Sequence, residues 1–168
     1  MNSKKIALVT GASSGIGEAL SRELVKRGWS VIGMARSLDK LTSLQKELGS
    51  TFIPVMCDVS EKADIESASK QIIEQKIIPS HFFLNAGIAG EKVIENPNAF
   101  DLSMHEQIMA VNYFGVLAFV EFLEKPCQEN GGANFIVTSS INAIFAPPTG
   151  SAYCASKAAI AKASKAYP

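Results

Sequence analysis

The sequence predicts an α/β fold, in which helices lie on both faces of one doubly wound parallel sheet. Along its 168 residues, short runs rich in β-branched residues alternate with longer segments whose apolar residues recur every three or four positions. This alternation is typical of βαβ units. A glycine-rich turn at residues 10–17 stands between the first such run and the first such segment, where a doubly wound sheet meets its ligand. We therefore expect one sheet and a single domain over residues 1–168.

Five short apolar runs are expected to be strands. They are Ile6–Thr10, Ser30–Met34, Thr51–Cys57, His81–Asn85 and Asn134–Ser139. Right-handed crossovers predict the strand order 3-2-1-4-5, with a ligand at the carboxyl ends of the first and fourth strands. Pro54 favours this order, because proline is tolerated in a sheet mainly at an edge, and the order places the third strand there.

Helices are expected between and after these strands, each with apolar residues at spacings of three and four. The expected helices are about Gly15 to Arg27, the segment with Leu38, Leu41, Leu44 and Leu48, the segment around Ile65, Ala68 and Ile72, about Met104 to Lys125, and a last helix from Ser151.

The helix expected at 104–125 is apolar on nearly every side. Between Ile108 and Leu123 its strongly polar residues are Asn112 and Glu121. A helix that is apolar all round must be covered all round. We expect one face to lie on the sheet and the other on a second copy of the chain, which would make the protein a homo-oligomer. Coverage by the same chain is the alternative.

The charge balance argues against nucleic acid as a partner. Sixteen Lys and Arg residues stand against sixteen Asp and Glu residues, so no basic surface is expected for a phosphate backbone. The apolar stretches are interrupted by Asn112 or Glu121 before they reach the roughly 18–20 residues that span a bilayer. The first residues lack the apolar core of a signal peptide. We therefore expect a cytoplasmic protein that does not bind membranes.

The cysteines point to neither disulfides nor a metal site. They are odd in number, widely spaced and without a CxxC or paired-His pattern, which suits reduced thiols. His81 and His105 likewise have no partner at metal-ligand spacing, and we expect both to be structural. The three cysteines are Cys57, Cys127 and Cys154.

The glycine-rich turn is expected to bind the pyrophosphate of a dinucleotide. Its glycines would permit a tight turn at Gly11 and a close approach of the backbone at Gly15 and Gly17, next to a helix N-terminus. Such glycines also occur in ordinary left-handed turns, but the strand before and the helix after favour nucleotide binding. Further donors to phosphate and ribose are expected from Ser13, Ser14 and the backbone around Ile16.

Arg36 favours NADP over NAD. It follows the second strand, where the sequence has no acidic residue to hold a ribose 2′-hydroxyl. A guanidinium can instead contact a 2′-phosphate with two hydrogen bonds. Residues 13 and 14 are serines, so they add no second basic group. The alternative is an ordinary solvated arginine.

Tyr153 and Lys157 form the most specific pair in the chain. A free phenol has a pKa near ~10 and is a poor proton donor and acceptor at neutral pH. On a helix, residues four apart share a face, so the Lys157 ammonium would stabilise the Tyr153 phenolate. With Ser140 upstream, this pattern predicts redox chemistry on a nicotinamide cofactor. For the tyrosine alone, the alternative is a half-buried aromatic residue.

Taken together, the motifs resemble those of the short-chain dehydrogenase/reductase family, classical single-domain type. The resemblance covers nearly the whole chain and implies a Rossmann-like fold. The motifs stand in the family's order: the turn Thr10–Gly17, Cys57-Asp58-Val59, Asn85-Ala86-Gly87, Asn112, Ser139-Ser140, and Tyr153-Cys-Ala-Ser-Lys157.

The resemblance also implies roles around the cofactor. Asp58 would hold the adenine amino group and Val59 would flank the ring, while Asn85, Ala86 and Gly87 would form the floor beneath the cofactor. Considered by itself, Asp58 could equally be a turn residue that caps the next helix.

Further roles implied by the resemblance concern catalysis. Tyr153 would exchange a proton with the substrate oxygen as hydride moves to or from the nicotinamide. Ser140 would hydrogen-bond the same oxygen. Lys157 would also bind the nicotinamide ribose, and Asn112 would hold a water that links the lysine to solvent.

The family's pattern continues beyond the helix with Tyr153 and Lys157, whereas this sequence stops at Pro168. The fifth strand is therefore expected to lack a neighbour. Two interpretations stay open. The chain is an NADP-dependent oxidoreductase that interconverts a carbonyl compound and an alcohol, or it is a catalytically weak NADP-binding protein with a binding or structural role. Apolar or small residues at Ile88–Phe100 and Ile141–Pro148 favour a modest hydrophobic carbonyl compound or secondary alcohol as substrate.

Overall fold

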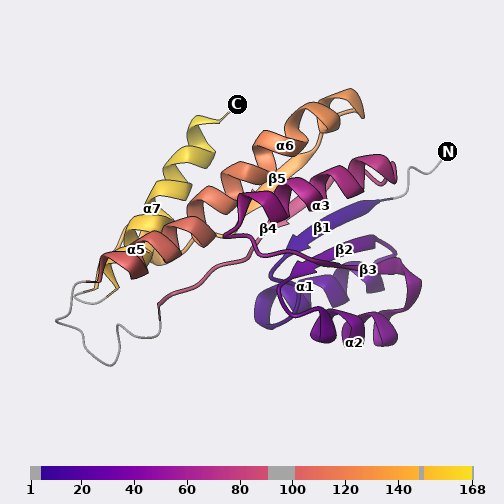
Figure 1. The fold of residues 1–168 in the computed structure, drawn as a ribbon, viewed down its shortest axis with the longest axis horizontal. Coiled ribbons are helices and arrows are strands. Elements are labelled where there is room, and N and C mark those ends of the chain that lie inside the picture. The colour runs from indigo at the N-terminus through magenta and orange to yellow at the C-terminus, as the bar shows by residue number, and fades with distance from the viewer. Residues whose placement is uncertain (1–4, 91–100, 148–149, 168) are drawn as a thin grey trace.

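The computed structural model describes residues 5–90, 101–147 and 150–167. Five parallel strands form one sheet in the predicted order, β3-β2-β1-β4-β5 (Figure 1). Four of the observed strands differ by one or two residues from the expected bounds, because the chain enters or leaves the sheet slightly earlier or later than expected. The strands are β1 Ile6–Thr10, β2 Ser30–Ala35, β3 Phe52–Met56, β4 His81–Leu84 and β5 Asn134–Val137.

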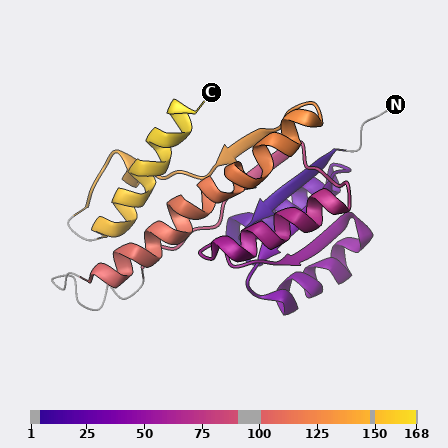
Figure 2. The ribbon, with the colours of Figure 1, turned by 45° about the horizontal axis from the view of Figure 1, so that its top comes forward.

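Helices cover both faces of this sheet, as predicted (Figures 1 and 2). On one face, α3 and α6 pack against each other and on strand residues such as Leu8 and Phe82. On the other face, α1 and α2 pack on Ala7 and Val9. The helices are α1 Gly15–Lys26, α2 Leu38–Leu48, α3 Lys62–Glu74, α5 Leu102–Met109, α6 Gly115–Glu129 and α7 Ser151–Ala166.

The two sheet edges differ in their protection. β3 lies at one edge, where Pro54 pairs with Gly33 of β2, as the proline predicted. β5 lies at the other edge and pairs with β4 alone among the strands that the structure describes. Its Ile136 is 39% exposed. The β5 edge therefore carries apolar surface that no proline protects.

The long helix expected at 104–125 extends from residue 102 to residue 129 and contains a π-helical turn, Ala110–Phe114, between α5 and α6. By length and composition it could cross a membrane, contrary to the expectation from the sequence, and it is the one such helix in residues 5–90, 101–147 and 150–167. A core helix meets the same criterion, and α6 packs on the sheet and on α3, where Lys62 and Glu121 form an ion pair at 2.9 Å. Cytoplasmic location stays a prediction.

One face of this helix is buried and the other is exposed. Phe119 and Leu123 are 1% and 0% exposed, whereas Phe114 is 59% exposed. The buried face packs on the sheet, as expected. The exposed face is the one expected to meet a second copy of the chain, and the homo-oligomer stays a prediction.

Two leucines of α6 give a matched test of this arrangement. We expect Leu123→Ala to lower the free energy of unfolding by about 2–5 kcal/mol, because it opens a cavity in the core. Leu117 is 36% exposed, and Leu117→Ala should change the unfolding free energy by less than about 1 kcal/mol. Urea denaturation of both variants measures the difference, and similar losses would contradict the assigned face of α6.

Candidate active site

The candidate site lies at the carboxyl ends of β1 and β4, which Thr10 holds together. Its Oγ1 accepts hydrogen bonds from the backbone N–H groups of Asn85, at 2.9 Å, and Ala86, at 3.0 Å. The Asn85 Nδ2 atom donates a hydrogen bond to the Thr10 carbonyl oxygen at 3.2 Å. Thr10 is 2% exposed. The Ala86 N–H depends on its hydroxyl, whereas the Asn85 N–H also bonds to the Phe83 carbonyl oxygen at 2.9 Å. In the sequence, Thr10 stood out as part of the turn and not for this role.

The glycine turn has the tight geometry that its sequence predicted. Gly11 has a φ of +69°, and a Cβ there would lie 3.1 Å from the Ala86 Cα. Gly15 also has a positive φ, +55°, and borders open space. Gly17, however, faces the turn itself, because a Cβ there would lie 2.2 Å from the Gly11 carbonyl oxygen. Gly17 thus allows α1 to pack on the turn, and the close approach of its backbone to a pyrophosphate stays a prediction.

Above this turn lies a cavity of about 280 Å³ whose lining reaches from β1 to the ends of β2 and β3. Arg36 stands at its rim, with its side chain 68% exposed. The Arg36 Nη1 atom lies 4.0 Å from Asp58 Oδ2. The lining residues include Gly11, Ser13, Ser14, Arg36, Lys40, Asp58, Val59, Ala86, Gly87 and Ile88.

The Asp58 side chain shapes a turn, whereas its contact with an adenine amino group stays a prediction. Its Oδ1 accepts hydrogen bonds from the Ser60 backbone N–H, at 3.0 Å, and from the Ser60 hydroxyl, at 2.7 Å, which makes it a turn residue. Its Oδ2 faces Arg36 within the cavity lining. One oxygen therefore shapes the loop after β3 while the other is directed toward the cavity.

Lys40 is a second cation that the sequence interpretation missed. It lies in the first turn of α2 and lines the same cavity as Arg36. Residues 13 and 14 are serines, whereas residue 40 supplies the second basic group. Its spacing of four from Arg36, across the start of a helix, was the signal available in the sequence.

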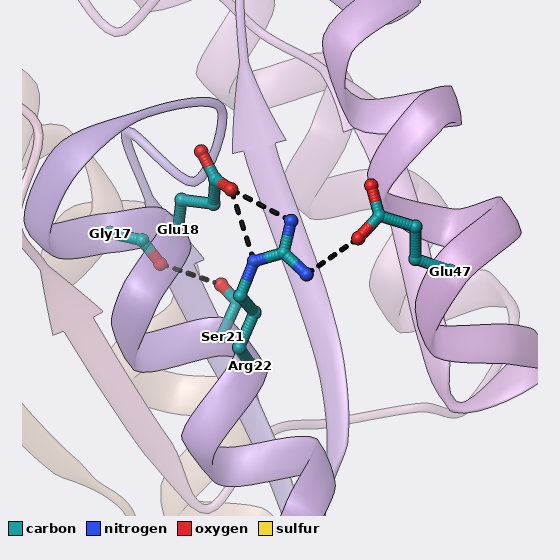
Figure 3. Close-up of polar contacts among 5 residues, drawn as sticks. All are labelled: Gly17, Glu18, Ser21, Arg22 and Glu47. Carbon is teal, nitrogen blue, oxygen red and sulfur yellow. Dashed lines mark hydrogen bonds and ion pairs between the residues drawn. The ribbon is translucent and has the colours of Figure 1, made fainter.

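A brace of charged side chains holds α1 against α2 beside this cavity (Figure 3). Arg22 of α1 contacts Glu18 at 2.9 Å and Glu47 of α2 at 2.7 Å. The hydrogen bond to Arg22 is the main reason why the pKa of Glu47 is lowered. In the same view, the Ser21 hydroxyl donates to the Gly17 carbonyl at 2.8 Å. The brace links the helix after the glycine turn to the helix that carries Lys40.

A second cavity, of about 310 Å³, lies beyond the glycine turn and contains Tyr153 and Lys157. It shares part of its lining with the first cavity, so the two form one continuous cleft over the ends of β1 and β4. The shared residues are Gly11, Ser14, Ala86, Gly87 and Ile88. The second cavity adds, among others, Ile16, Asn85, Thr138, Tyr153 and Lys157.

Tyr153 and Lys157 face each other on α7, as their spacing predicted. The Lys157 Nζ atom lies 5.8 Å from the centroid of the Tyr153 ring. It donates a hydrogen bond to the Thr138 carbonyl at 2.8 Å. Lys157 is 4% exposed, and this burial lowers its pKa, because desolvation disfavours the charged form.

Asn112 lies in the π-helical turn and is buried. Its Nδ2 donates to the Ile88 carbonyl and to the Ser156 hydroxyl, both at 2.9 Å, and its Oδ1 accepts from the Ile88 backbone N–H at 2.9 Å. These bonds use both amide hydrogens and one oxygen lone pair. Asn112 therefore joins the loop after β4 to α7.

Ser140 lies in the loop after β5, outside the lining of the two cavities. Its Oγ accepts a hydrogen bond from the Asn142 backbone N–H at 3.2 Å and caps the 3₁₀ turn Ile141–Ala143. This turn packs against α7, which carries Tyr153. Of the segments expected to border the substrate, residues 91–100 and 148 lie outside the described residues.

The thiols are buried and unpaired in the structure. Burial raises the pKa of Cys57 to about 12 and the pKa of Cys127 to about 11. Cys154, next to Tyr153, is also a free buried thiol. Among residues 5–90, 101–147 and 150–167, no three His, Cys, Asp or Glu side chains are grouped to hold a metal ion.

Thr10 offers a test of how the site is held together. We expect Thr10→Val to lower the free energy of unfolding by about 1–3 kcal/mol, because the Ala86 N–H loses its partner. Thr10→Ser keeps the hydroxyl and should retain most of the stability. Urea denaturation of the two variants gives the comparison. Equal stability of Thr10→Val and the unaltered protein would show that the hydroxyl does not hold the loop after β4.

Comparison with known proteins gives consistent matches over almost the whole chain. A family model described as short chain dehydrogenase matches residues 5–167. An NADPH-dependent pterin aldehyde reductase from Arabidopsis thaliana is 34% identical over 171 residues, which cover 96% of this chain and 67% of that protein.

Solved structures agree with the family match. A short-chain dehydrogenase from Streptomyces avermitilis aligns with a TM-score of 0.87 and 26% identity, over 99% of this chain and 60% of that one. A closed form of serine dehydrogenase complexed with NADP⁺ aligns with a TM-score of 0.88 and 26% identity, over 96% of this chain and 64% of that one. The chain thus spans about two thirds or less of the length of these relatives.

Proposed function

This chain belongs to the short-chain dehydrogenase family, and on that premise we propose that it is an NADP-dependent oxidoreductase that interconverts a carbonyl compound and an alcohol. One observation carries the proposal. A continuous cleft runs from two cations, Arg36 and Lys40, across the glycine turn to Tyr153 and Lys157. It therefore has a place for a phosphorylated ribose at one end and for a proton-transferring pair at the other.

The residues of the cleft fit an NADP molecule. Gly15 borders open space at the start of α1, where backbone N–H groups favour a pyrophosphate. Arg36 and Lys40 would hold the 2′-phosphate, and Lys157 would bind the nicotinamide ribose. When bound, the cofactor supplies or accepts the hydride. The Arabidopsis relative is named as NADPH-dependent, which agrees with this choice.

Tyr153 and Lys157 would manage the proton. In the reductive direction, Tyr153 donates its hydroxyl proton to the substrate oxygen, and in the oxidative direction it accepts that proton. Lys157 stabilises the resulting phenolate by Coulomb attraction, which is strong because the ammonium is 4% exposed. The Thr138 carbonyl holds this ammonium in place at 2.8 Å.

Ser140 and Asn112 would support this step from either side. We expect the Ser140 hydroxyl to donate a hydrogen bond to the substrate oxygen and so favour the charge that develops there. The three hydrogen bonds of Asn112 leave one lone pair on its oxygen, which could accept a bond from a water that relays protons to Lys157.

The substrate proposed here is an uncharged, largely apolar carbonyl compound or alcohol. Three large apolar side chains next to Ser140 are exposed to solvent: Ile141 by 67%, Ile144 by 87% and Phe145 by 62%. Such exposure is unusual beside a reacting centre unless a ligand covers it. These residues would cover the apolar part of the substrate.

Replacing Tyr153 tests the proposed acid/base role. We expect Tyr153→Phe to lower kcat by about 10²–10⁴-fold and to leave the Kd for NADPH within about twofold. Absorbance assays of NADPH oxidation on a panel of aldehydes and ketones measure the first, and calorimetry the second. Tyr167→Phe, at a tyrosine that is 46% exposed and outside the cleft, is the control.

Two results would count against this role. If Tyr153→Phe weakened NADPH binding as much as turnover, the residue would serve binding alone. If the unaltered chain bound NADPH tightly without reducing any carbonyl compound, the alternative of a binding or structural role would replace the enzymatic proposal.

The cofactor preference depends on the two cations at the rim of the first cavity. We expect Arg36→Ala and Lys40→Ala each to weaken NADPH binding by about tenfold and NADH binding by less than twofold, because a charge-assisted hydrogen bond to the 2′-phosphate is lost. Calorimetry with both nucleotides measures this. Lys46→Ala, at an exposed lysine near the other end of α2, is the control. Parallel weakening of NADPH and NADH would contradict the assignment.

A further inference from the structure

The first turn of α7 carries Tyr153, and within the described residues its N-cap makes no side-chain capping hydrogen bond. Its N-cap residue is Gly150, whose φ of +87° is left-handed and which offers no capping group. A helix N-terminus without such a cap tends to fray, because its first N–H groups lack partners. Other contacts must therefore hold the turn that positions Tyr153.

One such contact comes from His105 in the first turns of α5. The ring nitrogen Nδ1 lies 3.0 Å from the Asp101 carbonyl oxygen, and Nε2 lies 3.1 Å from the Ser151 hydroxyl. A carbonyl oxygen only accepts, so Nδ1 donates to it. Nε2 and the Ser151 hydroxyl then share the second hydrogen bond of the ring.

A second contact to α7 lies in the buried interior of the protein. Asn112 donates to the Ser156 hydroxyl at 2.9 Å, and Ser156 donates to the Tyr153 carbonyl at 2.8 Å. His105 and Asn112 are seven residues apart on one continuous helix, which is two helical turns. Their partners on α7 are five residues apart. The two links therefore enclose the turn that contains Tyr153, one at the surface and one in the core.

We propose that His105, acting through Ser151, is a positioning residue that fixes the direction of the Tyr153 side chain. This inference rests on the proposed function of Tyr153. Ser151 precedes Tyr153 by two residues in the same helical turn, so a rotation of this turn moves the phenol relative to the substrate. Small displacements of a reacting group lower the rate much more than they lower binding. Neither His105 nor Ser151 lines the two cavities of the cleft.

Steady-state kinetics on a double-mutant cycle provide the first test. We expect His105→Ala and Ser151→Ala each to lower kcat by about tenfold and to leave the Kd for NADPH within twofold. The double variant should be no slower than either single one, because both remove the same link. His105→Gln and Ser151→Thr, which can still form a hydrogen bond, should recover part of the lost kcat.

His81→Ala is the matched control. His81 contacts Ser80 and Asn134 at the amino end of the sheet, away from the cleft, and its replacement should leave kcat unchanged. Multiplicative losses of kcat in the double variant, or equal losses of kcat and of NADPH affinity, would overturn the proposal.

Amide hydrogen exchange tests the same link without turnover. Peptides that cover residues 150–157 should exchange about 3–10-fold faster in His105→Ala and in Ser151→Ala than in the unaltered protein, because local opening of the turn becomes easier. His81→Ala should not change this exchange. Unchanged exchange in His105→Ala would show that the link does not hold the helix. If the unaltered chain lacks reductase activity, the proposed function fails, while the exchange result still decides whether His105 holds α7.

Discussion

The site depends on a buried cation whose charge no carboxylate neutralises. Lys157 is 4% exposed, and its Nζ bonds to the Thr138 carbonyl. No carboxylate in the described part of the chain lies within ion-pair distance of it. Burying an ammonium in this way is unfavourable, and the lowered pKa of Lys157 reflects that desolvation. The buried ammonium lowers the stability of the fold, but its positive charge borders the cleft. It therefore favours any negative charge that develops on a group beside it.

This charge can assist a reaction only if the ammonium keeps a fixed position. Hydrogen bonds between segments that are distant in the sequence provide that position. Lys157 is held from β5 through Thr138, and Ser156 is held from the π-helical turn through Asn112. A π-helical turn adds a residue to the helical repeat and redirects the side chains around it. In this way Asn112 reaches both the loop after β4 and α7. The cleft is thus lined by residues at the carboxyl ends of the five strands that the structure describes, by the interrupted helix and by α7.

The fold and the main site residues could be predicted from the sequence because their signals are local. Each signal involves residues that are close in the sequence. The signals are the alternating strand and helix patterns, a proline in an edge strand, and a tyrosine four residues before a lysine. The unpredicted features depend on residues that are distant in sequence. Thr10 meets Asn85 and Ala86 across two strands, and His105, expected to be only structural, meets Ser151. Gly17 likewise has a neighbour that the sequence did not indicate, because the Gly11 carbonyl oxygen lies where a Cβ of residue 17 would be.

The placement of these bonds also decides how far the site depends on the exposed β5 edge. Hydrogen bonds from other segments reach the first half of α7 at Ser151, Ser156 and Lys157, and Tyr167, just beyond α7, hydrogen-bonds Glu124 of α6. The second half, from Ile160 to Tyr167, borders an apolar groove beside α6 and β5. A surface that covered this groove would contact α7 at residues beyond Lys157. Lys157 itself is held by its hydrogen bond to the Thr138 carbonyl. Polar contacts from other segments of this chain therefore hold the helical turns that carry Tyr153 and Lys157.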